Sequence, residues 1–276
     1  AEEAHAQQMT KSVLVIWVVL KVLVSYDSGA FSAVLGTDNG ITDDLELSTS
    51  QQGALGSTVF LGNTVGCAIA GHLFSHYSAK KLMTMSLTAH TFLTFLFGLS
   101  NAYEADMVIR FFLGVTLAFI VVYSPIWVDE FAPKSSATLW MALCNVGVPI
   151  GIMLGFVVGG MLPTNTALSW RWAFYIKALL MIPLTMYFNS LNGKYIDISH
   201  TRMQRAAIAT GGADKSFTAL LDKLYAIVRA LISNGLLMSN VMALSSMYFV
   251  VTALQTFVTP YLRGPPFFAS MNTIVL

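Results

Sequence analysis

The sequence predicts an all-α, polytopic membrane protein. Of its 276 residues, 55% are hydrophobic and only 11% are charged, and the mean hydropathy is +0.67. The apolar residues also gather in long runs that short polar segments separate. The hydrocarbon core of a bilayer is about 30 Å thick, which about 20 helical residues cross at 1.5 Å per residue. We therefore expect lipid, rather than water, to surround most of the chain.

Seven apolar segments are long enough to cross a bilayer. They are 12–35, 53–74, 81–100, 107–128, 138–162, 171–190 and 235–262, and an eighth begins at Met271. The second segment follows Ser48-Thr-Ser-Gln51, whose spacing predicts a capping box that satisfies free backbone donors of the first helical turn. The odd number of segments predicts that the chain is part of a longer protein.

Acidic and basic residues fall into different loops, although the net charge is only +1. If the N-terminus is cytoplasmic, the acidic loops face outward, and Arg263 is the only basic residue of an outer loop. This distribution follows the positive-inside rule, so it predicts a multi-pass protein with its N-terminus in the cytoplasm. Which membrane holds it stays open. The outward-facing acidic residues are Asp38, Asp43, Asp44, Glu46, Glu104 and Asp106.

The stretch 191–234 is the one long polar break, and it predicts a cytoplasmic linker. Its second part, 216–233, places apolar residues at helical spacing, which predicts an amphipathic helix packed on the inner ends of the bundle. A regulatory or lipid-binding role is the alternative. The predicted organisation is a six-helix bundle at 1–190, this linker, and the beginning of a second bundle at 235–276.

Residues 71–81 lie between the second and third segments and read Gly-His-Leu-Phe-Ser-His-Tyr-Ser-Ala-Lys-Lys. They resemble the inner-loop motif of the major facilitator superfamily, in which a glycine and three further residues precede Asp-Arg and a basic pair. Gly71, Lys80 and Lys81 match the motif, whereas Ser75 and His76 replace the Asp-Arg pair. The resemblance implies a helical bundle of two six-helix halves, of which this chain holds the N-terminal half and part of the C-terminal half.

In that family, the acid and the arginine of the motif help to hold the two halves together on the cytoplasmic side. Their replacement here weakens this gating contact. Asp129 and Glu130, at the inner end of the fourth segment, are candidates to supply part of it, with the lysines of the motif as partners.

Further segments carry the same resemblance. Residues 110–114 are similar to the arginine-x-x-x-glycine motif of the family, and residues 170–174 open the sixth segment as in many members. Residues 25–30 and 248–255 are similar to the Spinster-like branch, which is associated with export of lysolipids or organic anions.

The fifth segment resembles the glycine-rich fifth helix of the family. Glycines at intervals of four form one smooth face, which lets a neighbouring helix approach closely in lipid. We expect this face to act in helix packing and as a rocking hinge, with substrate contact as the alternative. Its members are Gly147, Gly151, Gly155 and Gly159.

Four charged residues lie inside the predicted spans: Lys21, Asp27, Arg110 and Lys177. A charge near the centre of a bilayer costs at least about 2.5–3.5 kcal/mol on insertion scales, so it usually faces a partner or a watery cavity. Asp27 lies between Tyr26 and Ser28-Gly29, in a polar and flexible part of its helix. It is the first candidate for a proton-coupling site, and a static ion pair with another span is the alternative.

The remaining polar residues of the spans complete the candidate site. Arg110 either reaches the outer interface or points inward to hold an anionic group, whereas a cavity role is favoured for Lys177. Three cations against one acid favour an anionic or zwitterionic solute. Asn145 can bind the solute or another helix. His90 is expected to be a satisfied core group, with proton transfer as the alternative.

These features favour a secondary transporter that moves a small organic solute by alternating access, with protons as candidate coupling ions. The sequence has no phosphate-binding glycine loop, nucleophile elbow or paired metal ligands, so we expect no enzyme activity, cofactor, metal or nucleic-acid partner. The alternative is a transport-inactive scaffold or subunit of a membrane complex. A seven-helix receptor is disfavoured, because that class places its N-terminus outside. The oligomeric state stays open.

Overall fold

Every long apolar segment of the sequence forms a helix. The computed structural model describes residues 2–198, 225–226, 228–230 and 232–275, and within these ranges it contains helices and no strand. The all-α prediction is confirmed. The seven predicted spans correspond to α1 (Glu2–Gly36), α3 (Thr49–Phe74), α4 (Ala79–Leu99), α5 (Tyr103–Phe131), α6 (Ala137–Asn165), α7 (Arg171–Ser190) and α10 (Gly235–Arg263). Three short elements are α2 (Ile41–Asp44), the 3-10 turn η1 (Gly193–Tyr195) and α11 (Met271–Val275).

Six of the described helices are long and apolar enough to cross a membrane. They are α3, α4, α5, α6, α10 and the part of α1 from Gln8 to Gly36. α7 is not among them, although the sequence predicts a span at 171–190. It is 20 residues long and carries two basic residues, Arg171 and Lys177.

The chain divides into two compact units. One comprises residues 1–198 and 259–276, and the other comprises residues 199–258. The second unit contains α10 as far as Val258. The amphipathic helix predicted at 216–233 lies mostly outside the described residues.

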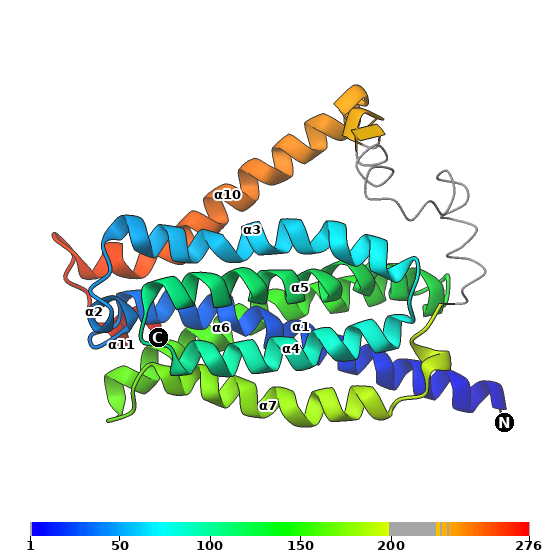
Figure 1. The fold of residues 1–276 in the computed structure, drawn as a ribbon, viewed down its shortest axis with the longest axis horizontal. Coiled ribbons are helices and arrows are strands. Elements are labelled where there is room, and N and C mark those ends of the chain that lie inside the picture. The colour runs from blue at the N-terminus through cyan, green and yellow to red at the C-terminus, as the bar shows by residue number, and fades with distance from the viewer. Residues whose placement is uncertain (1, 199–224, 227, 231, 276) are drawn as a thin grey trace. The chain divides into compact units, whose positions relative to one another are not determined.

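The long helices α1, α3, α4, α5, α6 and α7 of the first unit run side by side (Figure 1). α1 packs on α6 and α7, α3 packs on α5, and α4 lies between α5 and α7. We call the two ends of this bundle the Asp38 end, where α1 ends, and the Lys80 end, where α4 begins. Fully buried aromatic side chains fill the bundle: Trp17 of α1 has ring centroids of Tyr123, Trp127 and Phe188 within 5.9–6.2 Å.

The sequence predicted the start of α3 correctly but not the start of α5. Ser48 and Gln51 form the predicted capping box at the start of α3, where the Ser48 backbone N–H donates to Gln51 Oε1 at 2.9 Å. By contrast, α5 begins at Tyr103, four residues before the predicted span. Asp106 therefore lies in a helix and is fully buried, rather than facing outward from a loop.

The glycine face of α6 packs against α1. A Cβ atom added at Gly155 would lie only 2.0 Å from the carbonyl oxygen of Tyr26, so the two backbones are in direct contact. From α1, Gly29 approaches the backbone of Ile152 in the same way. Four buried glycines of α6 form this contact: Gly147, Gly151, Gly155 and Gly159.

Ion pairs connect helix ends at the Asp38 end. Arg171, the first residue of α7, lies 2.5 Å from Asp44 Oδ2 and also donates to Asn101 Oδ1 at 2.5 Å. Arg263, the last residue of α10, lies 2.5 Å from Asp38 Oδ2. The last turn of α10 is therefore held to the end of α1.

Candidate functional site

A charged cluster lies inside the helical bundle and joins three helices. Asp27 of α1 and Lys177 of α7 form an ion pair through Asp27 Oδ2. His90 of α4 places its Nε2 atom 2.9 Å from Lys177 Nζ and 3.4 Å from Asp27 Oδ2. Lys177 and His90 are 0% and 2% exposed, whereas the Asp27 side chain is 16% exposed. Asp27 is therefore the least buried of these three side chains.

Lys177 uses all three of its N–H donors within this cluster. It donates to Asp27 Oδ2, to His90 Nε2, and to Thr94 Oγ1 at 3.3 Å. A buried ammonium is expensive unless its donors are satisfied and its charge is paired. The three acceptors therefore explain how a lysine is retained in the interior of a membrane protein.

Thr116 of α5 orients His90. Its hydroxyl donates to the carbonyl oxygen of Leu113 at 2.9 Å, so its oxygen is left to accept from His90 Nδ1, also at 2.9 Å. A neutral imidazole with its proton on Nδ1 then has Nε2 free as the acceptor for Lys177. The ring thus serves as a neutral ligand of the lysine.

One oxygen of the cluster has no hydrogen bond. Asp27 Oδ1 is buried without a partner among the described residues, while Oδ2 carries the contacts to Lys177 and His90. A carboxylate oxygen without a donor can accept a proton without displacing an existing hydrogen bond. The arrangement can therefore add a proton to Asp27 and remove the negative charge that faces Lys177.

The side chains of Arg110 and Tyr26 contact residues outside the Asp27–Lys177–His90 cluster. Arg110 is 5% exposed, donates through Nε to the carbonyl oxygen of Leu55 at 2.8 Å, and stacks its guanidinium 3.6 Å from the ring centroid of Phe31. Its side chain points inward, not to the outer interface. Tyr26 donates its hydroxyl to the carbonyl oxygen of Ala173 at 3.1 Å, so it ties α1 to α7.

Lys21 and Asn145 differ from the other candidates, because neither makes a hydrogen bond or ion pair with the described residues. Lys21 is 9% exposed and lies on α1 beside Gly147 of α6, whereas Asn145 of α6 is exposed. The structure thus separates Lys21 from the Asp27 cluster. Among the described buried cations, Lys177 has an acidic partner and Lys21 has none.

The inner-loop residues at the Lys80 end make short-range contacts. Ser75 donates to the carbonyl oxygen of Gly71 at 3.1 Å, and His76 Nδ1 lies 3.0 Å from the carbonyl oxygen of His72. These contacts complete the last turn of α3. The Ser75 hydroxyl and His76 Nδ1 therefore bond within the end of α3 and not to another helix.

Asp197, which the sequence analysis did not single out, binds the start of α4. Its Oδ1 accepts from the backbone N–H of Lys80 at 2.8 Å and from the Ser78 hydroxyl at 2.9 Å. The adjacent Ile196 accepts a hydrogen bond from the Tyr123 hydroxyl at 2.5 Å. The segment after α7 thus holds the first turn of the neighbouring helix α4.

The two acidic residues that were candidate partners of Lys80 and Lys81 lie in the last turn of α5. Asp129 is exposed at the end of α5, and no ion pair within the described residues joins it to Lys80 or Lys81. Glu130 follows it and is half-buried. The part of the chain that the structure describes also holds no group of three or more potential metal ligands.

His90, Thr94 and Thr116 are the members of the cluster that sequence reasoning missed or set aside. His90 and Thr94 lie four residues apart in α4, so their spacing alone could have placed both side chains on one face of that helix. Nothing in the spacing of Thr116 indicates its contact with His90, since the two residues belong to different helices.

Comparison with known proteins identifies the sequence family. A sequence model of the Major Facilitator Superfamily matches residues 18–271. The probable sphingolipid transporter spinster homolog 1 of Arabidopsis thaliana is 31% identical over 148 residues, which are 54% of this chain and 30% of that protein. The chain spans about a third of the length of such curated relatives.

Two solved structures share the fold. One is a bacterial homolog of the human lysosomal transporter Spinster in an inward-facing, unoccupied conformation, with a TM-score of 0.69 and 14% identity over 96% of this chain and 58% of that one. The other is a D-xylose-proton symporter, with a TM-score of 0.62 and 15% identity over 96% and 64% of the two chains. At these identities, the likeness concerns the fold alone.

Proposed function

This chain belongs to the major facilitator superfamily, and on that premise we propose that it is part of a secondary active transporter that moves a small organic solute by alternating access. The family agrees with the prediction of a multi-pass membrane protein that is not an enzyme. We further propose a cytoplasmic N-terminus, which the distribution of charged loop residues supports.

The proposed coupling ion is a proton, and its proposed site is Asp27. The observation that carries this proposal is the buried Asp27–Lys177 pair, with Asp27 Oδ1 left without a hydrogen bond. Protonation of Asp27 removes the counter-charge of Lys177, and the contact between α1 and α7 then loses its ionic component. Such a change alters the relative stability of two helix arrangements, which is what coupling to a conformational change requires.

The proposed solute carries an anionic group, and it is either an anion or a zwitterion. Lys177 is neutralised by Asp27, and Arg110 is fixed by Phe31 and Leu55, so Lys21 is the buried cation best able to take the solute's anionic group. Asn145 lies on the adjacent α6 and offers an amide for a hydrogen bond. The charge balance of the site supports this assignment.

The second candidate function is a transport-inactive scaffold or subunit of a membrane complex. The observation in its favour is the replaced inner-loop motif, because Ser75 and His76 bond to carbonyl oxygens of their own helix. In this view, the Asp27–Lys177 pair is a static connection between α1 and α7.

Solute flux by the full-length protein in liposomes separates these two functions. Uptake under an imposed pH gradient is measured for the wild type and for Asp27→Asn, across a panel of organic anions and zwitterions. We expect uptake that Asp27→Asn abolishes, whereas Glu104→Gln, at an exposed acid in the first turn of α5, preserves it. If correctly folded wild type moves no solute of the panel, the scaffold function replaces the transporter.

A further inference from the structure

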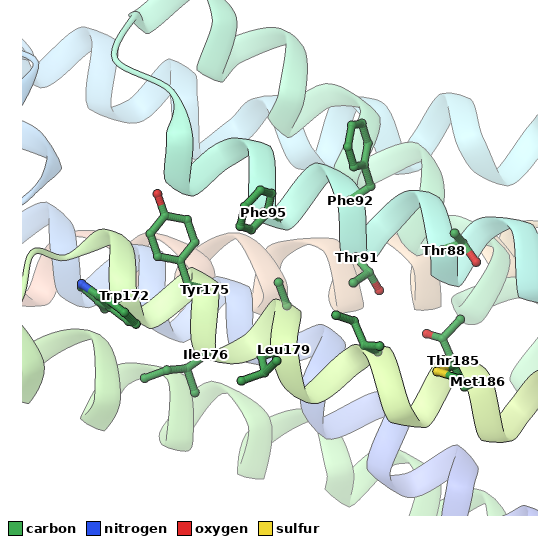
Figure 2. A pocket seen from close by; sticks show the side chains of 12 residues that line it. Thr88, Thr91, Phe92, Phe95, Trp172, Tyr175, Ile176, Leu179, Thr185 and Met186 are labelled. Atoms are coloured by element: carbon green, nitrogen blue, oxygen red, sulfur yellow. The ribbon is translucent and has the colours of Figure 1, made fainter.

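A long apolar groove runs along the outer surface between α4 and α7. It has a volume of about 740 Å³ and extends from Trp172 to Met186 on α7 and over residues 88–95 of α4. Figure 2 shows Phe92 and Phe95 on the α4 side, and Trp172, Ile176 and Leu179 along α7. Neither the proposed proton site nor the proposed solute contacts use this groove.

The groove presents mainly hydrocarbon, because three of its polar side chains bond to backbone of the bundle and the Thr185 hydroxyl is buried without a partner among the described residues. The hydroxyls of Thr88 and Thr91 donate to the carbonyl oxygens four residues earlier in α4, at 2.8 Å each. The Tyr175 hydroxyl donates to the carbonyl oxygen of Gly98 at 2.7 Å. A polar ligand would therefore find few free partners along the groove, whereas an apolar one fits its chemistry.

The groove is long enough for an extended hydrocarbon chain. From Trp172 to Met186 it is about 21 Å long at 1.5 Å per residue. A single extended hydrocarbon chain is thinner than a helix and follows a groove of this form.

The groove also lacks the small residues that this bundle uses where helices meet closely. α1 and α6 touch through Gly29 and Gly155, and α3 and α5 touch through Gly62 and Gly114, with backbone against backbone. No glycine lines the groove, and most of its side chains are bulky. The lining is therefore unlike the helix–helix contacts of the same molecule.

We propose that this groove binds one acyl chain of a bilayer phospholipid, with its headgroup at the Trp172 end. α4 is apolar enough to cross the membrane, and membership of a family of membrane transporters places the groove beside lipid. Trp172 is 46% exposed at the beginning of α7, and tryptophan is enriched where the headgroups meet the hydrocarbon. The chain is held by packing, which is the contact that stabilises association within lipid.

The groove lies directly behind the charged cluster. Ile176 and Ala178, which line it, flank Lys177 in α7, and Thr91 follows His90 in α4. An acyl chain between the two helices therefore supports the spacing at which Lys177 reaches His90 and Thr94. This binding site does not depend on the proposed transport activity, and it would be present in a transport-inactive protein as well.

Photolabelling tests the site. The full-length protein is placed in nanodiscs of phosphatidylcholine that carries a photoactivatable diazirine in its acyl chain, and labelled peptides are mapped by mass spectrometry after irradiation. We expect labels concentrated in residues 88–95 and 172–186. Leu179→Trp, which fills the groove, should reduce this labelling several-fold, whereas Leu180→Trp, at an exposed α7 leucine outside the groove, should leave it unchanged.

Three outcomes would overturn the proposal. Labels could be as dense on exposed leucines elsewhere, such as Leu61 of α3 and Leu143 of α6. The two tryptophan variants, with thermal unfolding like the wild type, could label equally. A photoreactive amino acid at position 179 could capture another segment of the protein or a second copy, which would show that protein, and not lipid, fills the groove.

Discussion

The two sides of α1 hold their neighbours by opposite means. Toward α6, glycines bring backbone against backbone, and a Cβ at Gly155 would lie 2.0 Å from the carbonyl oxygen of Tyr26. Toward α4 and α7, Asp27 forms an ion pair with Lys177, whose ammonium also donates to His90 of α4. The α6 side has a single close-packed arrangement, because backbone atoms cannot give way. The other side depends on the charge of one carboxyl group.

This difference suggests how α1 can respond to a proton without losing its position. Close packing on α6 does not involve the charge of Asp27, so we expect α1 and α6 to stay packed when the carboxyl is protonated. The contact with α7 weakens when the carboxyl is neutral, because Lys177 then lacks a counter-charge. A helix with one fixed side and one charge-dependent side can transmit protonation to the rest of the bundle.

The largest expected effect is on the charged side. Lys177→Met leaves the Asp27 carboxylate buried without its partner, which should lower the free energy of unfolding by about 3–5 kcal/mol. Thermal unfolding of the full-length protein in detergent measures it. The double variant Asp27→Asn/Lys177→Met should recover most of the loss, because no unpaired charge remains. A double variant as unstable as Lys177→Met would mean that packing, and not charge, dominates this contact.

A smaller effect is expected on the glycine side. Gly155→Ala inserts a methyl group against a backbone carbonyl, and overpacking of this kind costs about 1–3 kcal/mol. Gly71→Ala is the matched control, because a Cβ at Gly71 meets nothing within 4 Å. Thermal unfolding should show a loss for the first variant and none for the second. Equal stability of the two variants would refute the close contact between α1 and α6.

The smallest effect concerns the orientation of His90. Thr116→Val removes the acceptor of His90 Nδ1 and should lower the free energy of unfolding by about 1 kcal/mol. The NMR signals of His90 should also change, because the ring is no longer fixed in one tautomer. Unchanged His90 signals would show that Thr116 does not determine the tautomer that faces Lys177.

Features set by short sequence spacing could be predicted. The capping box of Ser48 and Gln51 depends on a spacing of three residues, and the glycine face of α6 depends on a spacing of four. Long apolar runs likewise predicted the seven long helices of the described residues, because a run of about 20 apolar residues is typical of a membrane helix. The helix that each face contacts did not follow from these patterns.

Features set by distant residues could not be predicted. Asp27 and Lys177 are 150 residues apart, so each was identified as a costly charge without its partner. Asp197 holds the start of α4 from 117 residues away, and no local pattern marks it. Asp106 was placed outside because polar residues around it resemble a loop, whereas the helix begins earlier and buries it.

The most direct test of the proton site uses the double variant Asp27→Asn/Lys177→Met, which replaces the ion pair with two neutral side chains of similar size. Solute counterflow and pH-gradient-driven accumulation are measured with the same full-length protein in liposomes. If Asp27 is the coupling site, counterflow persists while the pH gradient no longer drives accumulation. If the variant accumulates solute as the wild type does, the Asp27–Lys177 pair is only structural, and the proton site lies elsewhere.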